Sequence, residues 1–120
     1  LVEDEEAVRR ATRRILERHG YKVLEAAQAG DALLLSEKHQ GVIDLMVTDV
    51  VMPHISGFEL ANRLSKTRPD MRVVFMSGYT DTAVQHHGNL DKDIAFVQKP
   101  FSSEKLLGTI RDELDRKRGD

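Results

Sequence analysis

No cysteine and no tryptophan occur in this chain of 120 residues, and aromatic residues make up only 5% of it. Without cysteine, disulfide frameworks and thiolate metal sites are excluded, and a reducing compartment is compatible. Neither sign of charge dominates: the net charge is −2, which provides no field to attract nucleic acid directly. Apolar runs fall short of the roughly 20 residues that span a bilayer, and no signal peptide is visible. We therefore expect a cytoplasmic domain that binds neither membrane nor nucleic acid by itself.

What the chain does contain is the composition of one soluble globular domain. Apolar residues make up 40% and charged residues 32% of the sequence, which is typical of a folded domain with a single core. The sequence opens at Leu1-Val2, without an initiator methionine and within what looks like a shortened strand. We expect residues 1–120 to form one domain, excised from a longer protein, whose N-terminal strand is truncated.

Short apolar runs alternate strictly with segments of helical periodicity. We expect five strands and five helices: strands at 1–2, 21–26, 43–48, 72–76 and 94–98, and helices at 5–19, 30–39, 57–67, 81–87 and 102–117. This alternation predicts an α/β fold with a parallel sheet. Because crossovers are right-handed, five strands favour a flavodoxin-like (βα)5 doubly wound sheet of strand order 2-1-3-4-5.

The most informative residue is Asp49, which ends the apolar run 43–48. A short apolar run of this kind is typical of a strand buried on both faces of a parallel sheet. Carboxylates are seldom placed where they would be buried unless they are paired or bind a metal. Asp49 is therefore expected at the carboxyl end of a central strand, where open α/β sheets place their sites. Taken alone, it could equally be an aspartate that starts a turn.

Polar side chains also follow the other expected strands. Glu3 and Asp4 follow the first strand, Ser77 the fourth and Lys99 the fifth. The order 2-1-3-4-5 brings these strand ends and that of Asp49 to one crevice. Each residue has an ordinary explanation by itself, such as an acidic terminus, a turn serine or a solvated lysine. Their placement at four separate strand ends favours a functional site.

The three carboxylates of this crevice suit a divalent cation. Acids packed together repel one another, and a hard cation with oxygen ligands relieves the repulsion. For Mg²⁺ we expect Asp4 and Asp49 as direct ligands, Glu3 acting through water, and the backbone carbonyl of Val51 as a further oxygen.

The remaining two groups suit phosphate oxygens. Lys99 offers a point charge and Ser77 a hydroxyl donor. Such a site can carry a phosphoryl group on Asp49, formed by in-line attack of the carboxylate.

Four segments of the sequence resemble one known family. They are residues 2–5, residues 48–53 together with Gly57, residues 76–79 and residues 96–101. They resemble the receiver domain of two-component response regulators over essentially the whole chain. Residues 77–81 and 98–101 are especially similar to receivers fused to hybrid sensor histidine kinases.

The resemblance implies a phosphoacceptor switch in a two-component phosphorelay. Asp49 would accept a phosphoryl group from the phosphohistidine of a histidine kinase or a histidine phosphotransfer domain. Glu3 and Asp4 would form the acidic pair that holds Mg²⁺, Ser77 the hydroxyl that moves toward the phosphate, and Lys99 its cationic contact. The domain would catalyse only its own phosphorylation and dephosphorylation, and its implied partners include a covalently linked kinase or output domain.

The resemblance also assigns a rotameric aromatic switch to Phe96 and a cis peptide bond to Lys99-Pro100. Three positions depart from the family pattern. Glu3 stands where many members have aspartate, and Phe96 lacks the hydroxyl of a tyrosine, so it would signal by packing alone. His54 occupies a loop position often held by glycine.

Two other functions are compatible with parts of this pattern. A magnesium-dependent phosphatase of the haloacid dehalogenase type also forms an aspartyl-phosphate, but it wants a second acid two residues after the nucleophile, where this chain has Val51. A phosphate-independent binding module of the same fold is the second alternative. The intact set of Asp4, Asp49, Ser77 and Lys99 argues against it.

Apolar residues at helical spacing in segment 5–19 predict that Val8, Ala11, Ile15 and Leu16 face the core. Five arginines occupy the same helix, at positions 9, 10, 13, 14 and 18. We expect them to form a solvated face paired with Glu6 and Glu17, or alternatively a docking surface for an acidic partner.

Overall fold

The computed structural model describes residues 1–78 and 94–116. The described elements are α1 (Glu6–Arg18), α2 (Ala29–Lys38), β1 (Leu45–Asp49), α3 (Gly57–Ser65), β2 (Arg72–Ser77), β3 (Ala95–Gln98) and α5 (Ser103–Asp115). They match the expected segments to within a few residues at each end. The expected helix at 81–87 lies outside the described residues.

The sheet is parallel throughout its described strands. β2 lies between β1 and β3, with Asp49 opposite Met76 and Ser77 opposite Gln98. Val2 forms parallel bridges to Ala26 on one side and to Thr48 on the other. The order across the sheet is thus the Ala26 segment, the Val2 segment, β1, β2 and β3, which confirms the predicted order 2-1-3-4-5.

The second expected strand, at 21–26, is reduced to a single bridge at Ala26. Its neighbour is the Leu1–Glu3 segment: the Ala26 N–H donates to the Leu1 carbonyl, and the Glu3 N–H donates to the Ala26 carbonyl. The Leu1 ammonium group donates to the Leu24 carbonyl at 2.8 Å.

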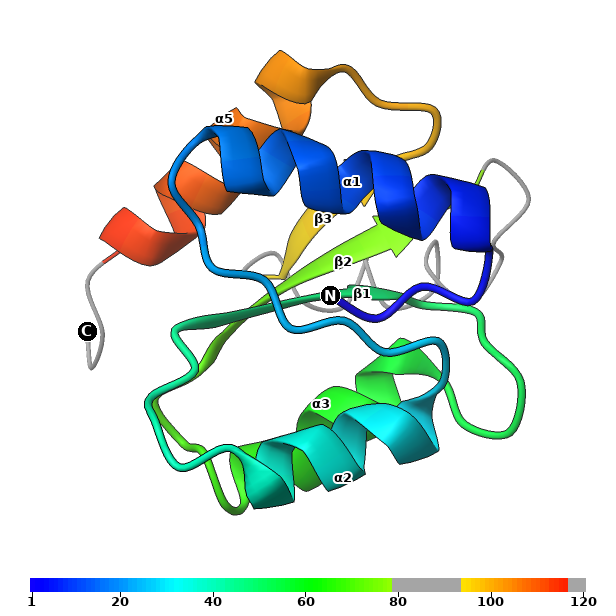
Figure 1. The fold of residues 1–120 in the computed structure, drawn as a ribbon, viewed down its shortest axis with the longest axis vertical. Helices are drawn as coiled ribbons and strands as arrows, with labels where there is room; N and C mark the ends of the chain where they lie inside the picture. The colour runs from blue at the N-terminus through cyan, green and yellow to red at the C-terminus, as the bar shows by residue number, and fades with distance from the viewer. Residues whose placement is uncertain (79–93, 117–120) are drawn as a thin grey trace.

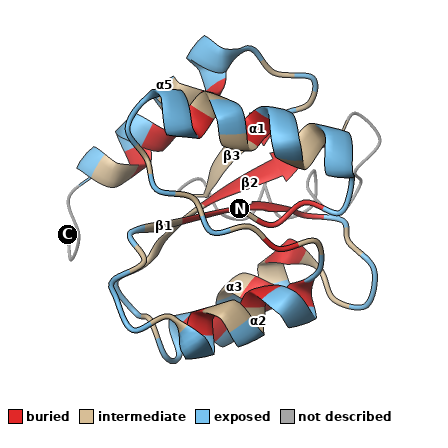
Figure 2. Cartoon of the chain, viewed as in Figure 1, coloured by how far each residue is buried: buried red, intermediate tan, exposed pale blue. Residues whose placement is uncertain are grey.

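Helices cover both faces of the sheet, as a doubly wound fold requires. α1 and α5 lie on one face, and α2 and α3 lie on the other (Figure 1). The side chains of consecutive β1 residues point to opposite faces of the sheet. Met46 packs in the cluster with Leu60 and Leu64 of α3, and Val47 packs in the cluster with Leu106 of α5. The buried residues accordingly line both helix–sheet interfaces (Figure 2).

Serine side chains start two of the helices. The Ser56 hydroxyl accepts from the Glu59 N–H at the start of α3, and the Ser102 hydroxyl accepts from the Lys105 N–H at the start of α5.

The inward face of α1 differs from the prediction at one position. Ala11 is exposed, whereas Thr12 is buried and its hydroxyl donates to the Val8 carbonyl at 2.8 Å. Thr12 lies one turn after Val8 and one turn before Leu16, so it shares their side of the helix, whereas Ala11 is rotated away from it. The local hydrogen bond satisfies the threonine hydroxyl and makes its burial possible.

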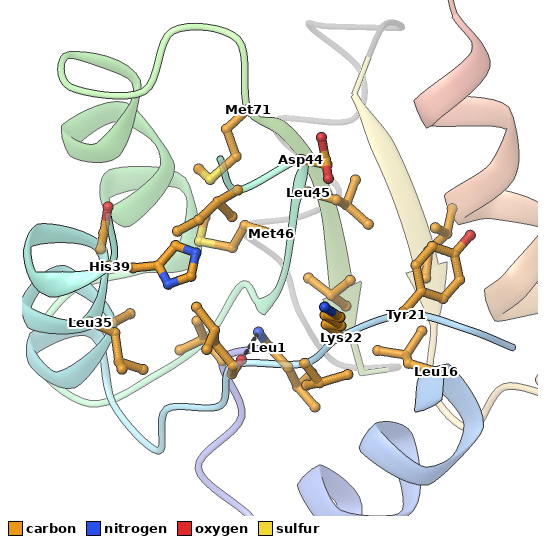
Figure 3. Close-up of a pocket in the computed structure, with 18 of the residues that line it drawn as sticks. Leu1, Leu16, Tyr21, Lys22, Leu35, His39, Asp44, Leu45, Met46 and Met71 are labelled. Atoms are coloured by element: carbon orange, nitrogen blue, oxygen red, sulfur yellow. Dashed lines mark hydrogen bonds between the residues drawn. The ribbon is translucent and has the colours of Figure 1, made fainter. Parts of the chain in front are cut away.

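A cavity of about 780 Å³ lies away from the expected site. It is bordered by Leu1, by residues 20–24 and by residues 42–47, at the starting end of β1. Figure 3 shows Leu1, Leu16 and Leu45 among the mainly apolar side chains around it. Within the described parts of the chain, no helix has both the length and the apolar character to cross a membrane.

Candidate functional site

Asp49 is the last residue of β1 and is 5% exposed. Its N–H donates to the Val2 carbonyl, and the following Val50 N–H donates to the Met76 carbonyl, so backbone bonds on both sides hold it. The first residue of α3 lies against its backbone, because a Cβ on Gly57 would come within 2.1 Å of the Asp49 carbonyl oxygen. Glycine at this position is therefore a requirement of close packing.

Lys99 reaches this carboxylate from β3. Its N–H donates to the Ser77 carbonyl at 2.7 Å, and the Lys99-Pro100 peptide bond is cis, as predicted. The Lys99 Nζ lies 2.6 Å from Asp49 Oδ1 and 2.5 Å from Glu3 Oε1. A single ammonium group thus bridges two buried carboxylates that are 46 positions apart in the chain.

The three acids expected to hold a cation do come together. Glu3, Asp4 and Asp49 each offer a carboxylate oxygen within 4.8 Å of the others. Glu3 is fully buried: one of its oxygens contacts Lys99, and the other accepts from the Glu5 N–H at 3.2 Å. Asp4 is exposed. Three carboxylates opposed by one ammonium fit a hard divalent cation that binds oxygen ligands, with Asp4 open to incoming water.

Burial raises the pKa of Asp49 to about 8, with a contribution from Glu3, while Lys99 acts in the opposite direction. For Glu3, burial works to raise the pKa, but hydrogen bonds with Asp49, Lys99 and the Glu5 N–H lower it overall. The pKa of Lys99 is raised, because the two carboxylates outweigh its own burial. Of these two buried acids, Asp49 therefore holds a proton more readily than Glu3 in the absence of a cation.

Ser77 and Phe96 lie on the next two strands across the sheet from Asp49, in β2 and β3 respectively. Ser77 is the last residue of β2 and is 6% exposed, one residue further along than the Asp49–Met76 pairing. Phe96 lies in β3 directly opposite Phe75 and is partly buried. Ser77 was expected just after its strand and instead ends it, which leaves it at the same edge of the sheet.

The loop after Asp49 is open to solvent. Val51 is 59% exposed, and its carbonyl remains a predicted ligand. His54 adopts a φ of 76°, the left-handed conformation that glycine adopts without cost. The backbone therefore keeps at His54 the shape that glycine would favour at this family position.

Two residues near the site were not anticipated from sequence. Arg9 donates from Nη1 to the Glu3 carbonyl at 2.9 Å and from Nε to Glu25 at 3.1 Å, so it ties α1 to the acidic segment. Arg13 also pairs with Glu25, whereas the expected pairs Arg10–Glu6 and Arg13–Glu17 form along the helix.

The other missed residue, Phe58, contacts the ring of Phe96. Helical spacing could not predict the contacts of Arg9 or Phe58, because each contact joins a helix to a different segment of the chain.

A doubly wound parallel sheet, with acids at the ends of the first and third strands and a lysine after the fifth, defines an α/β phosphoacceptor domain. The chain belongs to the response regulator receiver domain family, because the sequence pattern of that family matches residues 1–111.

Curated relatives carry the same domain in different settings. The chain is 41% identical over 116 residues to the sensor kinase CckA of Brucella abortus, covering 97% of this chain but 12% of that protein. It is 30% identical over 110 residues to the receiver protein CpdR of the same organism, covering 92% of this chain and 90% of that protein.

Solved structures agree with the fold. The receiver domain of the hybrid histidine kinase CckA superposes with a TM-score of 0.78 at 33% identity, over 95% of each chain. A CheY-like receiver from Methanospirillum hungatei gives a TM-score of 0.81 at 32% identity, over 95% of this chain and 90% of that one. The chain is thus a receiver domain of two-component signal transduction, a phosphoacceptor switch of flavodoxin-like fold, and nothing favours the phosphatase or the phosphate-independent module.

Proposed function

We propose that Asp49 is the phosphoacceptor and that it takes the phosphoryl group from a phosphohistidine. A carboxylate oxygen of Asp49 attacks phosphorus, the P–N bond to the donor imidazole breaks, and the imidazole keeps the bonding electron pair. The observation that carries this proposal is the position of Asp49 at a central strand end, next to Lys99 and two other acids. The attacking carboxylate must be unprotonated, so its raised pKa is a barrier that bound positive charge has to overcome.

Asp4 and Asp49 would hold Mg²⁺, with Glu3 beside them and the Val51 carbonyl as a further oxygen. The bound cation would supply positive charge that offsets the negative charge of the phosphoryl oxygens. Glu3, whose two oxygens already accept from Lys99 and the Glu5 N–H, is better placed to act through water than as a direct ligand.

Ser77, Lys99 and Phe96 read the phosphorylated state. Lys99 would exchange its contact with Asp49 for a phosphoryl oxygen, and the Ser77 hydroxyl would donate to another. Phe96 would respond by repacking its ring, since it has no hydroxyl to bond. The two states pre-exist, and phosphorylation shifts their populations.

We further propose that the donor is a histidine kinase or a histidine phosphotransfer domain, and that a kinase is covalently linked to this domain. The 41% identity to a sensor kinase over nearly the whole chain supports this assignment. Histidine phosphorylation would belong to the linked domain. This domain would catalyse only its own phosphorylation and dephosphorylation, on the cytoplasmic side of the membrane.

The test uses beryllofluoride with Mg²⁺ as a mimic of the phosphoryl group. Amide chemical shifts around Asp49, Ser77 and Phe96 should change in the wild type and equally in Asp44→Asn, a matched loss of an exposed carboxylate near the other end of the same strand. Asp49→Asn should not respond. A response of Asp49→Asn equal to that of the wild type would contradict the assignment.

A further inference from the structure

Three of the four phenylalanines in the chain form one cluster on the α3 side of the sheet. We propose that Phe58 is a positioning residue that couples the ring of Phe96 to the backbone of the phosphoacceptor segment. This inference rests on the proposed function, because it takes Phe96 as the residue that changes state when Asp49 is loaded.

The first half of the link is the ring packing. The centroid of Phe58 lies 4.7 Å from that of Phe75 and 6.1 Å from that of Phe96, and the Phe75 and Phe96 centroids are 5.7 Å apart. All three separations lie in the range of favourable aromatic pairs. The Phe58–Phe96 pair is edge-on, at an interplanar angle of 78°. A rotation of the Phe96 ring would therefore change a direct contact with Phe58.

The second half of the link is the backbone next to Phe58. The preceding residue, Gly57, donates its N–H to the Val50 carbonyl at 2.7 Å, and its α carbon leaves no room for a side chain against the Asp49 carbonyl. The first two residues of α3 thus touch the two ends of the proposed switch: one contacts the phosphoacceptor backbone and the next contacts the Phe96 ring.

The turn that joins these contacts is held in place. The Ser56 hydroxyl accepts from the Glu59 N–H at 3.1 Å, and Leu60 beneath the turn is fully buried. A turn anchored in this way transmits a displacement at one end to the other instead of absorbing it. The coupling must also act in reverse, so the packing at Phe58 should influence how readily Asp49 is loaded.

Burial distinguishes this role from simple core packing. Leu60 and Leu64 already seal α3 against the sheet, at 0% and 5% exposed, whereas Phe58 and Phe96 are both only partly buried. Rings that are partly exposed to solvent are less tightly confined than these two leucines.

The experiment compares Phe58→Leu with Phe101→Leu, the same chemical change on the opposite face of the sheet. Each variant is saturated with beryllofluoride and Mg²⁺, and chemical shifts are followed at Phe96 and at Asp49–Val50. We expect Phe58→Leu to keep the Asp49–Val50 response while its Phe96 response falls to less than half of the wild-type value. Phe101→Leu should keep both.

A Phe96 response in Phe58→Leu of half the wild-type value or more would overturn the inference. Should thermal melts show that Phe58→Leu does not fold, Phe58→Met, which fills the space with a flexible apolar chain, is judged by the same criterion. Failure of the proposed function would look different, because the wild type itself would then show no response at Asp49.

Discussion

Around Asp49, three carboxyl groups lie close together, and the Lys99 ammonium group contacts two of them. This excess of acidic groups governs what individual substitutions should do. Lys99 lies between Glu3 and Asp49, and Asp4 faces solvent without a comparable burial cost. Anything that adds positive charge relieves the imbalance, and anything that removes Lys99 increases it. The residue-level predictions follow from this arrangement.

Replacing the nucleophile should abolish phosphorylation. Asp49→Asn lacks the attacking carboxylate oxygen, so acetyl phosphate with Mg²⁺ should leave it unlabelled, whereas Asp44→Asn should label like the wild type. Mg²⁺ affinity should fall in Asp49→Asn and in Asp4→Asn, because each loses an oxygen ligand. Label that persists on Asp49→Asn would contradict its role as acceptor.

A comparison with Asp49→Asn should also show the raised pKa of Asp49, as a pH dependence of the free energy of unfolding. A carboxyl group with a folded pKa of about 8, against an ordinary value of 3.8, keeps its proton in the folded state between these limits but loses it on unfolding. Wild-type stability in metal-free buffer should therefore fall, relative to Asp49→Asn, as the pH rises from 4 to 8, and level off above 8. Each pKa unit corresponds to about 1.4 kcal/mol, so even two units would give about 3 kcal/mol. Urea unfolding at several pH values measures the gap, and a constant gap would contradict the prediction.

Lys99→Ala should separate phosphorylation from switching. The variant keeps the Asp49 carboxylate, so it should still accept phosphate from acetyl phosphate, though more slowly because no cation meets the incoming phosphoryl oxygens. It should fail to switch, because Lys99 is the group that reads the phosphate charge. If its free and phosphorylated spectra differ at Phe96 as much as those of the wild type, this role is wrong.

At the scale of elements, α3 begins directly against the phosphoacceptor segment. Its first residue packs on the Asp49 carbonyl, and its second packs on the aromatic cluster. The helix therefore does more than cover one face of the sheet: its start sets the position of the backbone that carries Asp49.

Gly57→Ala should destabilise the domain by about 1–3 kcal/mol, the usual cost of forcing a methyl group into a packed site. The obstacle is the backbone carbonyl of Asp49, 2.1 Å from the added Cβ, which cannot move aside as a flexible side chain would. Gly108→Ala in α5 is the control, because nothing lies within 4 Å of a Cβ there and alanine favours a helix. Thermal melts should therefore shift in opposite directions for the two variants, and a neutral Gly57→Ala would contradict the close contact.

For the molecule as a whole, the cavity beside Leu1 points to a longer first strand. Leu1–Glu3 already pairs with Ala26 on one side and β1 on the other, and continuing its alternating hydrogen bonds backward leads between residues 21–24 and 43–47. We propose that the domain includes an apolar strand segment upstream of Leu1 that fills this cavity. Burial lowers the pKa of the Leu1 ammonium group to about 6, with Glu25 acting in the opposite direction, and a peptide bond there would carry no charge.

Extending the chain upstream by four apolar residues should raise its Tm, whereas a Gly-Ser extension of equal length should not. A gain of about 1–2 kcal/mol would raise Tm by roughly 3–10 °C for a domain of this size. Without the extension, the chain should also gain stability as the pH rises from 6 to 8, because the Leu1 amine binds a proton in the unfolded state that it releases in the folded state. The extended chain should lose this dependence. Equal Tm values for the two extensions would contradict the proposal.

Local features of the sequence determined the layout of this domain. The apolar runs indicate where strands form, and Ser102 marks the start of a helix. Asp49, Ser77 and Lys99 lie at or just after strand ends, and this can be predicted without knowing which strands are adjacent in the sheet. Given parallel strands, their convergence at one edge of the sheet and the order 2-1-3-4-5 could be predicted, and both the fold and the family are confirmed.

Tertiary structure alone decided which side chains meet. Lys99 contacts Asp49 and also Glu3, which lies 96 positions before Lys99 in the chain. Arg9 and Arg13 of α1 pair with Glu25, and Phe58 of α3 contacts Phe96 of β3. The periodicity of apolar residues predicts which side chains of a segment face the core and which face solvent, because burial repeats with the geometry of a single helix or strand. Contacts between segments depend on strand register and on how each helix lies across the sheet, and these are set only when all the elements pack together.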